Sequence, residues 1–241
     1  ITYTKIESTV ETFKQTVESF FTKGGKGLNI TLPFKEAAFT LSDSCGQSAE
    51  NCRAVNTLSF SEDGRIYGES TDGLGLLKDL ENNGVYLQGK EVLMLGSGGA
   101  ARSVIPSLHQ QEVAGLTLCN RTNEKAIQMR EDFIHLRDIN VLDGPSLKND
   151  YDIVINATSA NLNNEVPLIN PDVLNNSICY DMGYTYGDTF FLRWAKKFNP
   201  SVCIQGWGML VEQAAESFSI WRGVRPETEE IILRLQKETE N

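Results

Sequence analysis

Residues 90–122 read KEVLMLGSGGAARSVIPSLHQQEVAGLTLCNRT, and this stretch decides the fold. An apolar run leads into Gly96-Ser97-Gly98-Gly99-Ala100, a helical pattern follows, and a second apolar run closes the unit. Strand, glycine turn, helix and strand in this order are the context that a dinucleotide fingerprint requires. Gly96 permits the tight turn, Gly98 lets the backbone approach a pyrophosphate, and Ala101 allows close packing of helix on strand. The stretch therefore predicts a phosphate-binding turn at the N-terminus of a helix.

The end of the second apolar run indicates which dinucleotide is bound. It reads Asn120-Arg121-Thr122, and Lys125 follows one helical turn later. An NAD site usually has an acidic residue here, which binds the ribose 2′-hydroxyl. Arginine instead offers a planar fork of donors to phosphate oxygens. We therefore predict NADP(H), with Arg121, Thr122 and Lys125 at its 2′-phosphate; a glycine-rich turn followed by a solvated basic helix start is the alternative.

Composition limits the class of partner. The chain has 241 residues, 40% of them hydrophobic, and a formal net charge of −10. An acidic balance disfavours nucleic acid and anionic membranes, and no apolar run approaches the ~18 residues of a membrane span. The first residues do not read as a signal peptide. Five cysteines without a close pair indicate free thiols in a reducing compartment. We therefore expect a cytoplasmic protein that acts on a small molecule.

Strands and helices alternate on both sides of the glycine turn. The predicted strands of this region cover 91–95, 115–119, 152–156, 177–181 and 201–204, and its helices cover 100–111, 123–136, 188–198, 208–221 and 226–239. Such alternation predicts a parallel sheet with helices on both faces. Before it we expect helices over 9–21, 34–42 and 73–82, a strand over 27–32, and a hairpin of 55–60 with 66–68. The sequence therefore predicts an α/β protein of two units, with a boundary near residues 70–73.

Three polar segments in the first unit are candidates for chemistry. They are residues 29–35, 54–57 and 70–73, and each follows or ends a short predicted strand, where ligand sites of α/β proteins concentrate. Lys35 can donate or accept a proton, and Asp72 is the carboxylate that could orient it. Such a pair beside a nicotinamide suits alcohol–ketone interconversion, since the nicotinamide carries the hydride and the lysine the proton. Each residue alone also fits a solvated helix start or a helix N-cap.

Two further segments could face a cofactor. In residues 206–213, Met209 and Gln213 are four apart and share one helix face. An apolar side chain and an amide on this face would suit a nicotinamide and a hydroxylated substrate, although Met209 could equally belong to the core. Residues 156–159 end a strand and could touch the cofactor or form only a turn. We find no cluster of His, Cys, Asp and Glu with metal-ligand spacing.

The order of these motifs resembles that of the shikimate dehydrogenases, the NADP enzymes of aromatic amino acid biosynthesis. The resemblance runs from Gly24 to the C-terminus. Eight segments carry it, namely residues 29–35, 54–57, 71–73, 96–100, 120–122, 156–158, 181–184 and 206–213. It implies a substrate domain of residues 1–71 with 206–241, and a Rossmann-type NADP-binding domain with a parallel sheet over 72–205.

The resemblance also implies a role for each candidate residue. Lys35, held by Asp72, would protonate the forming alkoxide when NADPH reduces 3-dehydroshikimate to shikimate. The substrate would be bound by Thr31, Lys35, Asn56, Asp72, Tyr184 and Gln213. NADP would be held by Gly96, Ser97, Gly98, Gly99, Ala100, Asn120, Arg121, Thr122 and Lys125, and its nicotinamide by Thr158, Met182 and Gly206.

One departure from the family keeps other readings open. The family opens with a strand and a serine-containing turn that binds the substrate carboxylate, and we find no such segment here. A quinate/shikimate dehydrogenase that prefers NAD is one alternative, and Arg121 argues against it. A non-catalytic NADP-binding module is another, although such a module has no need of Lys35, Asn56, Asp72 and Gln213. We expect a monomer or a homodimer.

Overall fold

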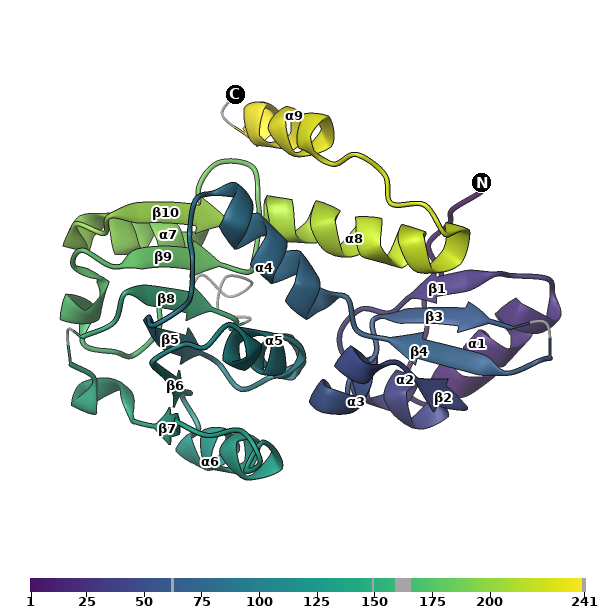
Figure 1. The fold of residues 1–241 in the computed structure, drawn as a ribbon, viewed down its shortest axis with the longest axis horizontal. Helices are drawn as coiled ribbons and strands as arrows, with labels where there is room; N and C mark the ends of the chain where they lie inside the picture. Colours follow the sequence, from purple (N-terminus) through teal and green to yellow (C-terminus); the bar gives the residue numbers. More distant parts are fainter. Residues whose placement is uncertain (62, 149, 159–165, 240–241) are drawn as a thin grey trace.

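The computed structural model describes residues 1–61, 63–148, 150–158 and 166–239. Two separate β-sheets organise these residues. Figure 1 shows the sheets at opposite ends of an elongated molecule, joined by the helices α4 (Asp72–Asn82) and α8 (Trp207–Arg222). The chain therefore crosses between the two halves along these helices.

The first sheet has four strands. In the order of their pairing they are β1 (Gly27–Asn29), β3 (Thr57–Phe60), β4 (Ile66–Glu69) and β2 (Ser44–Cys45). The pair β2–β4 is parallel and the other pairs are antiparallel. The helices beside it are α1 (Phe13–Thr22), α2 (Lys35–Leu41) and α3 (Gln47–Cys52). Phe13, Val17 and Phe21 recur every four residues on one face of α1, so they share a core with Leu58 of β3.

The second sheet has six strands, and all of its pairs are parallel. In spatial order they are β10 (Val202–Gln205), β9 (Ile178–Asp181), β8 (Ile153–Asn156), β5 (Glu91–Leu95), β6 (Gly115–Cys119) and β7 (Ile139–Val141). Along β5, Val92 and Met94 belong to one core, and Leu93 and Leu95 to the core on the other face. A strand buried on both faces must be apolar throughout, which explains its sequence.

The strand order of this sheet reverses between β5 and β8. From β5 the chain proceeds outward to β6 and β7, and it then returns to start β8, β9 and β10 on the other side. Leu95 pairs with Asn156, and Asn156 pairs with Asp181, so the strands end at one level. Ligands of open α/β sheets bind in the crevice at such a reversal.

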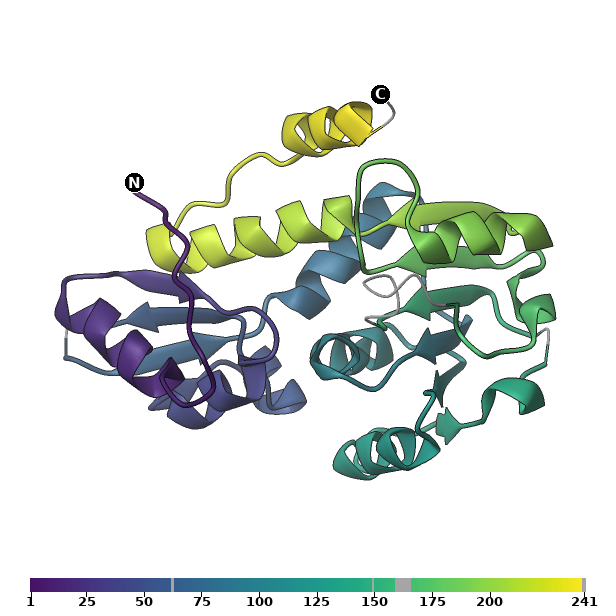
Figure 2. The same cartoon turned by 180° about the vertical axis from the view of Figure 1, so that it is seen from behind.

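Helices cover the second sheet and connect it to the first. Those beside the sheet are α5 (Gly99–Gln110), α6 (Asn123–Asp132) and α7 (Phe190–Ala195), with short 3-10 turns at Gly144–Ser146, Pro171–Leu174 and Lys196–Phe198. In both Figure 1 and Figure 2, α4 and α8 run side by side between the halves. Trp221 near the end of α8 donates a hydrogen bond to Leu58 O of the first sheet (2.9 Å). The last helix, α9 (Glu229–Thr239), packs beside α8.

The predicted fold class, an α/β protein with a parallel Rossmann-type sheet and a second, smaller α/β unit, is confirmed. The sequence does not predict β2, α3 and β7, because elements of 2, 6 and 3 residues are too short to show a period. The predicted helix over 123–136 ends at Asp132, and the predicted helix over 188–198 starts only at Phe190, where the Thr189 hydroxyl caps it. The predicted strand over 27–32 ends at Asn29.

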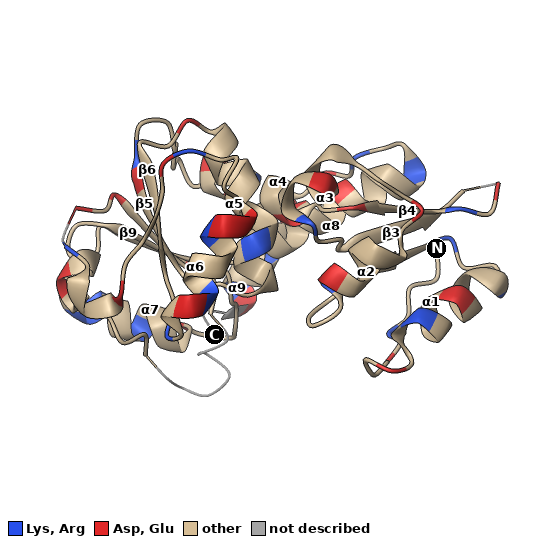
Figure 3. Cartoon of the chain, turned by 90° about the horizontal axis from the view of Figure 1, so that it is seen from below, with Lys and Arg blue, Asp and Glu red and all other residues tan. Residues whose placement is uncertain are grey.

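Charged residues of both signs are distributed along the whole chain. Figure 3 shows Lys and Arg interspersed with Asp and Glu along the ribbon of both halves. Among the described residues, no helix is both long and apolar enough to cross a membrane.

Candidate active site

Lys35 and Asp72 form an ion pair that joins the N-terminal ends of α2 and α4. Lys35 Nζ lies 2.5 Å from Asp72 Oδ2, and the two side chains are 12% and 9% exposed. Lys35 is the first residue of α2 and Asp72 the first of α4. Charges attract each other more strongly in a place that excludes water. The carboxylate therefore holds the amine in one position.

Close packing of α4 brings α8 to this pair. A Cβ at Gly75 would lie 2.7 Å from Gln213 Cβ, and one at Gly73 would lie 2.0 Å from Ser107 Oγ of α5. Both glycines therefore allow helix approaches that any side chain would prevent. As a result, Gln213 reaches the end of α4 that carries Asp72.

Asn56 connects the Lys35–Asp72 pair to Thr71, which precedes α4, and to Gln213 of α8. Its Nδ2 donates to Asp72 Oδ1 (2.9 Å), to Thr71 Oγ1 (2.9 Å) and to Gln213 Oε1 (3.1 Å). Its Oδ1 accepts from the backbone N–H of Thr71 (2.9 Å). Asn56 is 2% exposed, so this network is shielded from solvent and holds its polar groups in fixed directions.

A fully buried serine that sequence reasoning missed extends the network. Ser217 Oγ lies 2.7 Å from Thr57 Oγ1 and 3.3 Å from Thr71 Oγ1, and it accepts from Asn29 Nδ2 (3.0 Å). The only signal was its place four residues after Gln213, which puts both on one face of α8. Ser217 therefore links Asn29, at the start of a segment that the sequence singled out, to the residues around Asp72.

A thiol close to the pair stays protonated. Cys52 is 1% exposed, and its burial, together with the charge of Asp72, raises the pKa of the thiol above its usual value. A buried protonated thiol is a poor nucleophile, so Cys52 is not a candidate for nucleophilic chemistry here.

The glycine turn has the geometry of a phosphate site. Gly96 has a φ of +105° and its Cβ position lies 3.1 Å from the backbone of Ala157, so glycine is required there. Nothing lies within 4 Å of a Cβ at Gly98, and α5 begins at the next residue. Within the described part of the chain, the buried Ser97 Oγ has no hydrogen-bond partner. The open turn, the helix N-terminus and this hydroxyl together fit a pyrophosphate.

The basic end of β6 is solvent-accessible. Asn120 Nδ2 donates to Thr122 O (2.8 Å), which orders the turn into α6. Arg121, Thr122 and Lys125 are all exposed. Long basic side chains in this setting can reach an anion that sits beside the turn.

The residues predicted at the nicotinamide lie at the ends of β8, β9 and β10. Asn156 Oδ1 accepts from Thr158 Oγ1 (2.7 Å), and Asn156 O accepts from Met182 N (2.9 Å). A Cβ at Gly206 would lie 2.6 Å from Met182 O, so these two segments are in contact. Met209 is 7% exposed and belongs to the core. Thr158, Met182 and Gly206 therefore all lie where neighbouring strands end, on the side of the sheet that holds the carboxyl ends of its strands.

Thr31 and Tyr184 lie at the rims of the two halves. Thr31 is exposed, and the next side chain, Leu32 Cδ2, lies 3.3 Å from a Cβ position at Gly99 in the first turn of α5. Tyr184 is 45% exposed, and its ring centroid lies 4.5 Å from that of Trp207. The loop that follows β1 therefore faces the glycine turn, and Tyr184 is held from the other half by an aromatic contact.

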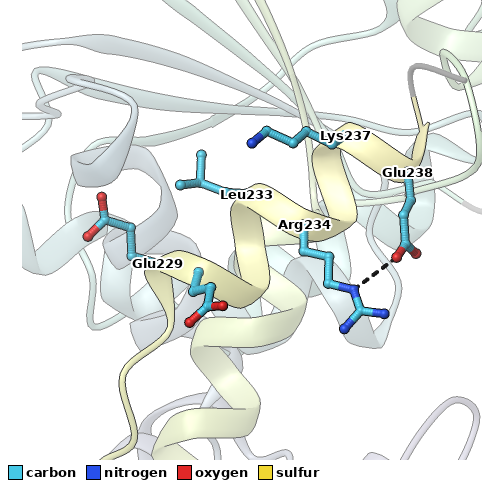
Figure 4. Close-up of a pocket in the computed structure, with 6 residues that line it drawn as sticks. Glu229, Leu233, Arg234, Lys237 and Glu238 are labelled. Carbon is cyan, nitrogen blue, oxygen red and sulfur yellow. Dashed lines mark hydrogen bonds and ion pairs between the residues drawn. The ribbon is translucent and has the colours of Figure 1, made fainter.

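A hollow of about 530 Å³ beside α9 is separate from these residues. Figure 4 shows its lining, which comes from α9 alone and consists of Glu229, Glu230, Leu233, Arg234, Lys237 and Glu238. Arg234 Nε and Glu238 Oε1 pair at 3.0 Å on the helix surface. The hollow contains no predicted site residue, so we assign the site to the residues around Lys35 and Asp72.

Three family descriptions match successive parts of the chain. They are the shikimate dehydrogenase substrate binding domain over residues 1–58, shikimate / quinate 5-dehydrogenase over 79–173, and the shikimate 5'-dehydrogenase C-terminal domain over 206–232.

Individual proteins match nearly the whole chain. A protein of Aeromonas salmonicida named shikimate dehydrogenase (NADP(+)) is 42% identical over 236 residues, which are 98% of this chain and 86% of that protein. The crystal structure of an Ael1 enzyme from Pseudomonas putida has a TM-score of 0.88 at 42% identity, covering 95% of this chain and 85% of that one. A shikimate 5-dehydrogenase from Thermus thermophilus in complex with NADP(H) and shikimate has a TM-score of 0.82 at 28% identity, covering 96% and 85%.

The fold and these matches define the class of protein, an oxidoreductase that acts on a CH–OH group with NADP. The chain belongs to the shikimate dehydrogenase family. The predicted family, enzyme class and cofactor are therefore confirmed.

Proposed function

We propose that this protein interconverts shikimate and 3-dehydroshikimate, with Lys35 as the proton donor and acceptor. The observation that carries the proposal is the shielded pair of Lys35 with Asp72, 2.5 Å apart, inside a network that also contains Asn56 and Gln213. An amine held by a carboxylate beside hydrogen-bonding amides suits a substrate with several hydroxyl groups.

The proposed roles divide between proton transfer and orientation. In the reduction, Lys35 gives its proton to the oxygen that becomes the hydroxyl, and in the oxidation it takes that proton back. Asp72 orients Lys35 and accepts from a substrate hydroxyl. NADP, when bound, supplies or accepts the hydride. Thr31, Asn56, Gln213 and Tyr184 hold the substrate from both rims of the cleft.

We propose that NADP lies along the reversal of the larger sheet. The open turn and the buried hydroxyl of Ser97 support a pyrophosphate at residues 96–100. Asn120, Arg121, Thr122 and Lys125 would bind the 2′-phosphate ribose, and Thr158, Met182 and Gly206 the nicotinamide. On this basis, residues 1–71 with 206–241 form the substrate domain and 72–205 the NADP domain. The cytoplasmic location and the monomeric or dimeric state stay predictions.

The direct test is NADPH formation followed at 340 nm, with shikimate and NADP⁺ supplied to this chain and to a version extended at its N-terminus. We expect NADPH formation that depends on shikimate in at least one of the two versions. Tight NADPH binding without turnover of shikimate or quinate in either version would instead favour a non-catalytic NADP-binding module.

Arg121→Ala should lower the preference for NADP over NAD. A hydrogen bond to a charged group contributes about 1.5–3 kcal/mol, and about 1.4 kcal/mol corresponds to a factor of ten. The ratio of kcat/KM for NADP to kcat/KM for NAD should therefore fall about 10- to 100-fold. Arg137→Ala, which removes an exposed charge beyond the end of α6, is the matched control. An unchanged ratio in Arg121→Ala would refute the assigned contact to the 2′-phosphate.

A further inference from the structure

Asp79 is a buried carboxylate that the proposed chemistry does not use. It lies on α4, seven residues after Asp72, and is 1% exposed. Seven residues are about two helical turns, so Asp72 and Asp79 share one side of α4 about 10 Å apart along its axis. A carboxylate is rarely buried in this way unless its environment provides hydrogen bonds.

The side-chain hydrogen bonds to Asp79 come from the larger sheet and from the residue that follows α4. Tyr180 of β9 donates its hydroxyl hydrogen to Asp79 Oδ2 (2.6 Å), and Asn83 Nδ2 donates to Asp79 Oδ1 (3.0 Å). Tyr180 is fully buried, and burial beside Asp79 raises the pKa of its hydroxyl well above the usual value. The phenol therefore keeps its proton and acts as a permanent donor.

Asp79 also contacts the start of α8. A Cβ at Gly208 would lie 1.9 Å from Asp79 Oδ1, so only glycine fits against the carboxylate. The pKa of Asp79 is raised, because burial and the nearby charge of Glu212 outweigh the hydrogen bonds from Tyr180, from the Met209 backbone and from Asn83. These donors replace part of the hydration that the carboxylate loses.

The three elements that meet at Asp79 adjoin residues of the proposed site. The helix α4 begins with Asp72, which holds Lys35. Met182 follows Tyr180 by two residues, and Gly206 directly precedes α8. Two of the three segments proposed to line the nicotinamide are thus fastened to the helix that fixes the proton donor.

We propose that Asp79 is a positioning residue, which holds Met182 and Gly206 at a set place relative to Asp72 and thereby aligns hydride transfer with proton transfer. The inference rests on the proposed function. Replacement of both partners of a buried polar contact by packed apolar groups is often neutral for stability. We therefore assign Asp79 to alignment, since a misplacement of about 1 Å can cost about 10²-fold in rate.

The test compares Asp79→Asn, Tyr180→Phe and the double variant with the wild type. We expect kcat for shikimate oxidation to fall about 10- to 100-fold in Asp79→Asn and about tenfold in Tyr180→Phe. The double variant should be no slower than Asp79→Asn, because both changes act through one contact. The deuterium isotope effect on kcat, with shikimate labelled at the reacting carbon, should rise because hydride transfer becomes slower. Tyr86→Phe, at a 69% exposed tyrosine, is the matched control.

Binding and stability measurements separate alignment from damage to the fold. The Kd for NADPH, from its fluorescence, and the KM for shikimate should stay within about twofold of the wild type, because alignment affects the transition state more than binding. Unchanged kcat in both single variants of an active wild type would overturn the inference alone. A loss of kcat that is accompanied by weaker NADPH binding and a lower Tm would also overturn it. Absence of turnover in the wild type would instead contradict the proposed function, on which the inference depends.

Discussion

Lys35→Arg lowers kcat for shikimate oxidation by about 10²- to 10⁴-fold, the range that a positioned general acid or base contributes. Arginine keeps the positive charge beside Asp72 and can still pair with it. Its guanidinium does not release a proton in proteins, so the ion pair survives while proton transfer is lost. Initial rates at 340 nm with saturating NADP⁺ give the measurement.

Comparison of Lys35→Met with Lys35→Arg separates loss of the proton from loss of the charge. Lys35→Met removes both the proton and the positive charge. Breaking a buried ion pair by removal of one partner costs about 3–5 kcal/mol of stability. We expect kcat to fall as in Lys35→Arg and, in addition, Tm to decrease. Lys78→Met, which removes an exposed lysine paired with Glu81 on α4, should change neither. Full activity of Lys35→Arg with an unaltered NADPH affinity would rule out Lys35 as the proton carrier.

Asp72→Asn should lower kcat/KM for shikimate by about 10²-fold, the cost of losing the orientation of a reacting group. The amide has the shape of the carboxylate, and its oxygen can still accept from Asn56 Nδ2, so the network around Asn56 should persist. What disappears is the charge that holds Lys35 Nζ. We therefore expect the change in kcat/KM for shikimate to exceed any change in the Kd for NADPH.

Asp63→Asn is the matched control for this variant. Asp63 is an exposed carboxylate of the same half, paired with Arg65 at 2.7 Å, and surface pairs of this kind contribute about 0–1 kcal/mol. Its removal should leave kcat/KM unchanged. Equal effects of Asp63→Asn and Asp72→Asn would show that net charge, and not the orientation of Lys35, controls the rate.

The sequence by itself determined five of the six strands of the larger sheet, and it also determined the cofactor. Apolar runs such as residues 92–95 suit only strands buried on both faces, and Gly96 takes a φ that few other residues tolerate. The basic residues after β6 could be interpreted at once because the fingerprint fixes where the ribose of a dinucleotide lies. These are local signals, since the relevant residues are neighbours in the chain.

The sequence named Lys35 and Asp72 as a candidate pair, but the tertiary structure decided which polar residues meet. Lys35 and Asp72 are 37 residues apart, and Asn56 and Gln213 are 157 apart, so no local period relates them. The contact of Asn56 with Gln213 depends on how closely α4 and α8 pack, which the small volume of Gly75 permits. Asp79 reads in the sequence as an ordinary residue of an amphipathic helix. Its burial against β9 and α8 exists only in the folded chain, because the helices must cross between the two sheets before that surface is enclosed.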